Sequence, residues 1–277
     1  MICEKIDLYA YFGLERKQNQ RGYLYTYARV PNGEEPPTKR RPAMLILPGG
    51  GYAMVSDREA EPVALFWASL GYNCFVLNYS IAPEYYPTQL TEAALAVWFI
   101  KQNAEKFATD TNFVAAIGFS AGAHLCAMLS QIGENKDIKL GCENKELQPN
   151  AVLLCYGVLS CACGHARTFE NVSNGGKIPY KKVDPSVMVT ANTAPTFLWT
   201  TVNDNCVPFE NSMVYAMELS KNSVPFELHV FRKGRHGLSV ATADTAWPDG
   251  EGIDDNIAEW KTLAKNWLES LGYGVHF

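Results

Sequence analysis

The residues with the clearest chemical potential are Ser120 and its neighbours, in the pentad Gly118-Phe119-Ser120-Ala121-Gly122. The apolar run Phe113–Ile117 before it predicts a buried strand, and Ala121–Gln131, rich in Ala, Leu and Met, predicts a helix. A serine on a tight turn between strand and helix exposes its hydroxyl above the sheet, and small neighbours let the backbone pass. This context predicts a nucleophilic serine; the alternative is a tight turn with a solvated hydroxyl.

A serine becomes nucleophilic when a neighbouring base takes its proton, so the histidines are the next candidates. The chain has five of them: His124, His165, His229, His236 and His276. We predict His236 as the base, because Gly234 and Gly237 place it in a flexible loop beyond the last predicted strand. His165 is its rival. The others are expected to pack under the serine turn (His124), to lie within a strand (His229) or to belong to the tail (His276).

An acid must orient the imidazole, and Asp204 has the right position for it. The run Ala194–Thr200 predicts a strand, and Asp204 is the carboxylate that follows its end. A serine, then an aspartate, then a histidine is the chain order of one known triad architecture. Asn203-Asp204-Asn205 is also turn chemistry, so a purely structural Asp204 is the alternative.

Backbone N–H groups that stabilise an oxyanion are expected after the apolar run Ala43–Leu47, in Pro48-Gly49-Gly50-Gly51-Tyr52. The spacing matches neither a dinucleotide-binding nor a P-loop fingerprint, which argues against a phosphate site. We predict that Gly50, Gly51 and Ala121 supply the donors. Ser56 and Glu59 then form a Ser-x-x-Glu capping box, which predicts a helix up to Leu70.

The order of these segments resembles that of the α/β-hydrolase superfamily. The chain is most similar to the bacterial xylan-esterase-like or acetyl-esterase branch, often labelled sugar hydrolases, which is related to the hormone-sensitive-lipase-like esterases. The matching segments are Pro48–Tyr52, Ser56–Ala64, Leu77–Pro83, Gly118–His124, Val207–Ser212 and His236–Ser239. Lipase-like relatives carry His where Pro48 stands and usually Arg where Ser80 stands. The glycan-ester branch tolerates Pro there, so the resemblance favours that branch.

The residues and the resemblance together predict a serine carboxylesterase that needs no metal or organic cofactor. The expected substrate is a small acyl ester, such as an acetyl ester of a sugar or xylo-oligosaccharide. Substrate contacts are expected from Tyr52, Tyr79 and His165. An amide hydrolase that uses the same triad, or a hydrolase-like binding protein without activity, is the alternative.

The remaining segments alternate strand and helix patterns, which predicts a mostly parallel sheet with helices on both faces. Strands are expected at 23–30, 43–47, 74–77, 113–117, 151–156, 196–200 and 226–231, and helices at 59–70, 89–103, 121–131, 208–222 and 254–271. Residues 160–193 break the alternation and predict a small cap over the site, which contains His165.

Length and composition bound the remaining possibilities. A chain of 277 residues predicts one α/β domain, residues 1–277, and a formal net charge of −5 argues against a nucleic-acid partner. The start shows no apolar signal segment, and no apolar run is long enough to span a membrane, so a cytoplasmic location and eight reduced cysteines are expected. The spacing of Cys161, Cys163 and His165 does not favour a metal site. A homodimer formed through an edge strand or the last helix is left open.

Overall fold

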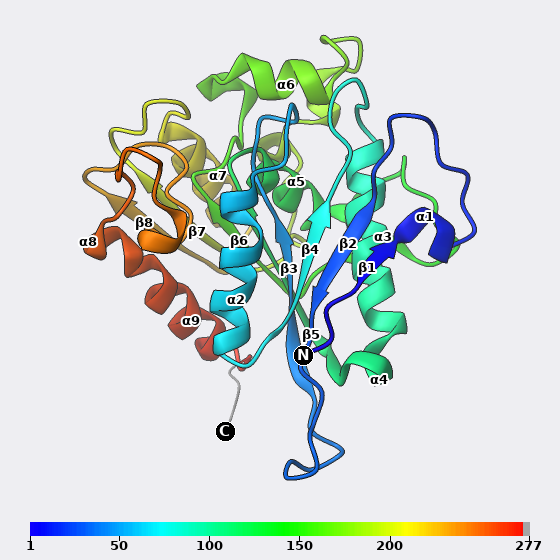
Figure 1. The fold of residues 1–277 in the computed structure, drawn as a ribbon. Coiled ribbons are helices and arrows are strands. Elements are labelled where there is room, and N and C mark those ends of the chain that lie inside the picture. The colour runs from blue at the N-terminus through cyan, green and yellow to red at the C-terminus, as the bar shows by residue number, and fades with distance from the viewer. Residues whose placement is uncertain (274–277) are drawn as a thin grey trace.

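A computed structural model describes residues 1–273, apart from the side chain of Ala166, and one eight-stranded sheet forms its centre (Figure 1). The strands follow the order β1-β2-β4-β3-β5-β6-β7-β8 across the sheet. Their bounds are β1 Lys5–Asp7, β2 Tyr23–Tyr27, β3 Arg41–Leu47, β4 Asn73–Asn78, β5 Thr109–Phe119, β6 Ala151–Cys155, β7 Thr196–Thr201 and β8 Phe226–Phe231. β2 pairs antiparallel with β1 and β4, and every other neighbouring pair is parallel. The predicted mostly parallel sheet is confirmed.

Helices cover both faces of the sheet, which is why β3 and β6 are buried along their whole lengths and, apart from Arg41 at the start of β3, apolar. The helices are α1 Leu8–Tyr11, α2 Glu61–Ser69, α3 Thr88–Gln102, α4 Ala104–Phe107, α5 Ala121–Leu129, α6 Ala166–Val172, α7 Glu210–Lys221, α8 Asp255–Ala258 and α9 Trp260–Ser270. Trp67 of α2 and Trp260 of α9 belong to one core cluster, and helix α2 lies in front of the sheet in Figure 1. Leu95 of α3, Leu125 of α5 and Tyr215 of α7 belong to the other.

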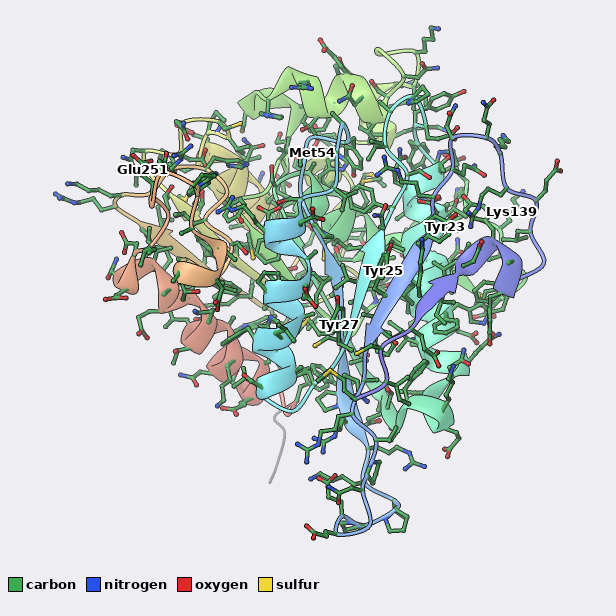
Figure 2. All side chains as sticks on the ribbon, in the orientation of Figure 1. Tyr23, Tyr25, Tyr27, Met54, Lys139 and Glu251 are labelled. Carbon is green, nitrogen blue, oxygen red and sulfur yellow. The ribbon has the colours of Figure 1, made fainter. Side chains whose placement is uncertain are left out.

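Strand β2, near the edge of the sheet, is buried on one face only. Leu24 and Thr26 are buried, whereas Tyr23, Tyr25 and Tyr27 are half-buried and follow one another along the strand (Figure 2). This alternation is the two-residue period of a strand that has one solvated face.

The chain termini differ most from the predicted elements. The helix expected over 254–271 is two helices, α8 and α9, which meet at Glu259. The short elements β1 and α1 were not predicted, because three- and four-residue elements carry too little periodicity to be recognised. His276 lies outside the described residues.

The predicted capping box at Ser56 and Glu59 is wrong. Residues Asp57–Glu59 form a 3₁₀ turn, η1, and the side chain of Ser56 makes no capping hydrogen bond. The Ser56 N–H donates to the Gly49 carbonyl, 3.1 Å away, so it is not free to bond Glu59. Helix α2 begins at Glu61, with Pro62 in its first turn, where a missing N–H costs nothing.

Residues 160–193 form short helical pieces above the carboxyl ends of the parallel strands, with α6 uppermost in Figure 1. The pieces besides α6 are the 3₁₀ turns η4 Cys161–Cys163, η5 Tyr180–Lys182 and η6 Pro185–Val187. Asn171 on α6 donates from Nδ2 to the Gly51 carbonyl at 2.7 Å, which ties the segment to the glycine-rich loop. That it acts as a cap stays a prediction, as does the division of the chain into domains.

Among residues 1–273, no helix is both long enough and apolar enough to cross a membrane.

Candidate active site

The turn between β5 and α5 holds Ser120 in a backbone conformation that non-glycine residues rarely adopt, with φ 53° and ψ −117°. The close approach of other backbone atoms explains why positions 118 and 122 on either side of Ser120 are glycine. A Cβ on Gly118 would lie 2.2 Å from the Gly122 carbonyl oxygen, and one on Gly122 would lie 2.0 Å from that of Leu47. Any larger residue at either position would force the turn apart, so the pentad is explained by backbone packing as well as by chemistry.

The structure brings Ser120, His236 and Asp204 together in one hydrogen-bonded chain. Ser120 Oγ lies 2.8 Å from His236 Nε2, and His236 Nδ1 lies 2.8 Å from Asp204 Oδ2. The three residues follow the ends of β5, β8 and β7, where the carboxyl ends of parallel strands meet. With the Nδ1 proton directed at Asp204, Nε2 can accept the serine proton.

Asp204 combines both roles that its sequence context allows. Its Oδ1 accepts the backbone N–H groups of Cys206 and Val207, each at 2.8 Å, and so closes the turn after β7. Its Oδ2 bonds His236, and the side chain is only 1% exposed. The turn therefore holds the carboxylate in position while one oxygen remains directed at the imidazole.

Two asparagines beside Asp204 hold the loop that carries His236. Asn203 Oδ1 accepts the Gly234 N–H at 2.7 Å, and Asn205 Oδ1 accepts the His236 N–H at 3.0 Å. Gly234 has φ 149°, and a Cβ there would lie 2.7 Å from both Thr201 and Ile257. The Asn-Asp-Asn segment therefore positions the base as well as the acid, and sequence reasoning missed this function of the asparagines.

The glycine-rich loop after β3 lies beside Ser120. Gly50 and Gly51 both line the cavity that contains Ser120, and both have positive φ, 126° and 61°. A Cβ on Gly50 would lie 2.3 Å from the Met54 carbonyl oxygen, so only glycine fits. Within residues 1–273, the N–H groups of Gly50, Gly51 and Ala121 have no hydrogen-bond acceptor in the protein, which leaves them available to a ligand.

Glu59 is a site residue that sequence reasoning missed. Its buried carboxylate accepts the Gly49 N–H through Oε2 and the Tyr156 hydroxyl through Oε1, each at 2.7 Å. Tyr156 Oη in turn accepts the Ser239 N–H at 2.9 Å, and the Tyr156 ring packs edge-on against His236, 5.0 Å between centroids. One carboxylate thus links the glycine-rich loop, the end of β6 and the histidine loop. The sequence did contain a signal for this role, because the acidic Glu59 follows the glycines closely. The capping-box interpretation assigned Glu59 to a helix start instead.

The prediction that Tyr52 and Tyr79 contact substrate is corrected by the structure. Both side chains are fully buried, and neither lines the cavity. Tyr52 Oη donates to His124 Nδ1 at 2.8 Å, and His124 Nε2 lies 2.6 Å from the Val183 carbonyl oxygen, to which it donates. Tyr79 donates to the Pro48 carbonyl. These rings lie beneath the glycine-rich loop and support it. Burial lowers the pKa of His124 to about 4, so the ring is neutral at pH 7.

His165, the third predicted contact, does line the cavity. Its Nδ1 lies 2.7 Å from Thr168 Oγ1, and its Nε2 lies 3.4 Å from Cys206 Sγ. Burial and the nearby His236 lower the pKa of His165. His165 is not bonded to Ser120, so the structure favours His236 over its rival as the partner of the serine.

The cavity has a volume of about 570 Å³. Its walls come from the glycine-rich loop, η1, α6 and the loops after β7 and β8. The lining residues are Gly50, Gly51, Ala53, Met54, Ser56, Arg58, Glu59, Ser120, His165, Arg167, Asn205, Cys206, Arg235, His236, Gly237 and Trp247. In the described part of the chain, no three His, Cys, Asp or Glu side chains are grouped so as to hold a metal ion.

Comparison with known proteins identifies the family to which this chain belongs. The BD-FAE family model matches residues 31–219. Endo-1,4-beta-xylanase B of Butyrivibrio fibrisolvens is 31% identical over 250 residues, which cover 85% of this chain and 39% of that protein. Acetylxylan esterase of Xylanibacter ruminicola is 26% identical over 211 residues, which cover 72% of this chain and 42% of that protein. The chain thus spans about two fifths of the length of these curated relatives.

A solved structure agrees over nearly the whole chain. The acetyl ester-xyloside bifunctional hydrolase of Caldicellulosiruptor lactoaceticus superposes with a TM-score of 0.76 at 34% identity, and the match covers 91% of this chain and 89% of that chain. The expected resemblance is confirmed, and the chain belongs to the BD-FAE family, in the xylan-esterase-like branch of the α/β-hydrolases.

Proposed function

We propose that this protein is a serine carboxylesterase that hydrolyses small acyl esters through an acyl-serine intermediate. The observation that carries the proposal is the continuous hydrogen-bonded chain from Ser120 through His236 to Asp204, which opens into a cavity of about 570 Å³. Relatives named as an acetylxylan esterase and an acetyl ester-xyloside hydrolase support the same reaction class.

In the first half-reaction, Ser120 Oγ attacks the ester carbonyl carbon while its proton passes to His236 Nε2. Asp204 accepts the Nδ1–H bond and stabilises the imidazolium. The carbonyl oxygen becomes an oxyanion, which the N–H groups of Gly50, Gly51 and Ala121 can stabilise. The tetrahedral species collapses, the C–O bond to the alcohol breaks, and the alkoxide takes the proton from Nε2.

In the second half-reaction, water replaces the alcohol. His236 takes a proton from the water, the resulting hydroxide attacks the acyl-serine, and the same donors stabilise the second oxyanion. The bond from the acyl carbon to Ser120 Oγ then breaks. Oγ regains its proton from Nε2, and the carboxylic acid leaves. Every proton is returned, so the proposed cycle uses only side chains and backbone of this chain, together with water.

We propose an acetyl group on a sugar or xylo-oligosaccharide as the substrate. Support comes from the relatives whose names contain acetylxylan esterase and acetyl ester-xyloside hydrolase. His165, Asn205 and Arg167 add polar groups to the cavity wall that can bond sugar hydroxyls. A cytoplasmic location and a homodimer stay predictions.

The test is hydrolysis of 4-nitrophenyl acetate and 4-nitrophenyl octanoate by the wild type and by Ser120→Ala. Fast acetate turnover that disappears in the variant supports a short-acyl serine esterase. Labelling of the wild type, but not of Ser120→Ala, by a fluorophosphonate probe identifies the nucleophile. An absence of both turnover and labelling would reject the proposal and favour a binding protein.

A further inference from the structure

Cationic side chains gather around the cavity that contains Ser120. The whole chain has a formal net charge of −5, yet the cavity lining includes three arginines, Arg58, Arg167 and Arg235, and one carboxylate, Glu59. Both oxygens of Glu59 are engaged by protein donors. Arg235 pairs with acidic residues outside the lining, so Arg58 and Arg167 are the lining cations that, within residues 1–273, have no carboxylate within 4.0 Å. A negative group of a ligand would be attracted to them.

Arg58 is held in a fixed orientation but lacks an anionic partner. Its Nε donates to the Thr245 carbonyl at 2.9 Å, Nη2 donates to the same oxygen, and Cζ lies 3.8 Å from the centroid of the Trp247 ring. In residues 1–273, no carboxylate lies within 4.0 Å of this half-buried guanidinium, and Nη1 makes no hydrogen bond. Nη1 is therefore a preoriented donor without an acceptor.

Arg235 provides an internal comparison, because it lies over the same Trp247 ring at 4.1 Å but is neutralised. Its Nη1 bonds Glu251 at 2.5 Å and lies 3.9 Å from Asp249. Figure 2 labels Glu251, the partner of Arg235, and Met54, which lines the cavity, and both lie on the upper part of the molecule. Burial is the main cause that lowers the pKa of Arg58. The charge of Arg235 lowers it further, whereas Tyr156 and the Glu59 carboxylate raise it.

The position of Arg58 indicates which part of an ester it would meet. In ester hydrolysis the histidine protonates the leaving alkoxide, so the alcohol part lies on the histidine side of the serine. Gly237 follows His236, and a Cβ on it would lie 3.9 Å from Arg58 Nη1 and 3.5 Å from the Trp247 ring. Arg58 and Trp247 thus border the space of the leaving alcohol.

We propose that the alcohol part of the natural substrate carries a carboxylate, which Arg58 binds beside Trp247 and Arg235. This inference rests on the proposed ester hydrolysis. A guanidinium fits a carboxylate because its planar donors match the two oxygens, and the free Nη1 of Arg58 provides the first of these bonds.

The experiment compares two acetate esters that differ in one charge: 3-acetoxybenzoate, which has a carboxylate on its alcohol part, and the neutral 3-acetoxybenzamide. We expect the wild type to favour the anionic ester in kcat/KM by roughly tenfold to a hundredfold, as for a charge-assisted hydrogen bond. Arg58→Met should abolish most of this preference, chiefly through KM. Arg40→Met is the matched control, because Arg40 pairs with Glu105 before β3, at the opposite end of that strand from the glycine-rich loop.

Equal kcat/KM for the two esters in the wild type, or a preference that Arg58→Met and Arg40→Met change equally, would overturn the inference. A preference for mono-4-nitrophenyl succinate over 4-nitrophenyl butyrate, without one between the benzoate and the benzamide, would also overturn it, because the anion would then bind on the acyl side. If neither ester is cleaved above Ser120→Ala, ester hydrolysis itself fails, which is a different result from equal turnover.

Salt dependence in the wild type keeps the test independent of any folding defect in Arg58→Met. Raising KCl from about 20 mM to about 500 mM should reduce the preference for the anionic ester, because salt screens the attraction between charges. A preference that does not change with salt contradicts the inference. Arg58→Lys, which keeps the charge but loses the planar fork, should retain part of the preference.

Discussion

Two polar regions lie on opposite sides of the glycine-rich loop, and they differ in whether their side chains have partners. The region beneath the loop, which consists of Tyr52, Tyr79 and His124, is buried and has its hydrogen bonds satisfied within the protein. The cavity above it contains Arg58, with an unpaired donor, and an unbonded set of backbone N–H groups. The lower region therefore supports the loop, whereas the upper one is free to bind a ligand.

Replacing Asp204 by Asn should have the largest effect on the upper region. Asn presents an N–H group to Nδ1 and favours the wrong imidazole tautomer, so kcat should fall by about 10⁴. Steady-state kinetics on 4-nitrophenyl acetate measures this, with Asp255→Asn as the control, because Asp255 is an exposed residue of α8. An unchanged kcat in Asp204→Asn would remove this residue from the proposed triad.

The lower region should make the free energy of unfolding depend on pH. His124 has an ordinary pKa of 6.5 and a folded pKa of about 4. Below pH 6.5 the unfolded chain binds a proton that the folded protein does not, so stability is lost as pH falls toward 4, by roughly 3 kcal/mol. Urea unfolding at pH 7 and pH 4.5 should show a smaller difference in His124→Gln than in the wild type.

A second buried group would affect both proteins in that experiment alike. Burial raises the pKa of Glu92 to about 7 despite donors from Ser80 and Tyr9, so its contribution to stability grows as pH falls from 7 toward 4.5. The difference between wild type and His124→Gln removes this term. The same pH dependence in both proteins would mean that His124 is not held neutral.

Glu59 connects the two regions, and its replacement should reduce rate more than binding. In Glu59→Gln one carboxylate oxygen becomes an NH₂ group, which faces a donor, either the Gly49 N–H or the Tyr156 hydroxyl. The glycine-rich loop then loses its alignment with the oxyanion, and kcat should fall roughly tenfold to a hundredfold with a smaller change in KM. A tenfold to hundredfold rise in KM with unchanged kcat would instead indicate a role in substrate binding.

The smallest effect is expected from Tyr52→Phe, which leaves His124 Nδ1 without its donor. This change should cost about 1–3 kcal/mol of unfolding free energy, because a buried acceptor is left unsatisfied. Tyr25→Phe on the half-exposed face of β2 is the matched control and should change stability little. A loss of kcat in Tyr52→Phe larger than its loss of stability explains would show that the lower region contacts substrate after all.

The same comparison explains which residues could be predicted. Ser120, Asp204 and His236 were recognisable because each follows a predicted strand and has a side chain that nucleophilic catalysis can use. Tyr52 and Tyr79 also follow strands, but an aromatic ring can face the core or the cavity, and strand position does not distinguish these. Glu59 was misassigned because a local pattern, the capping box, competed with a contact to Gly49 that becomes visible only in the folded chain.

The sequence by itself determined the alternation of strands and helices, the mostly parallel sheet and the three residues at its carboxyl edge. These follow from local periodicity and from turns that only glycine permits. Only the tertiary structure decided that Glu59 links Gly49 to Tyr156, that two tyrosines are structural, and that Arg58 and Arg235 both pack against Trp247. Such contacts join residues as far apart as positions 58 and 247, and the partner of a buried or charged side chain depends on the packing of the whole fold.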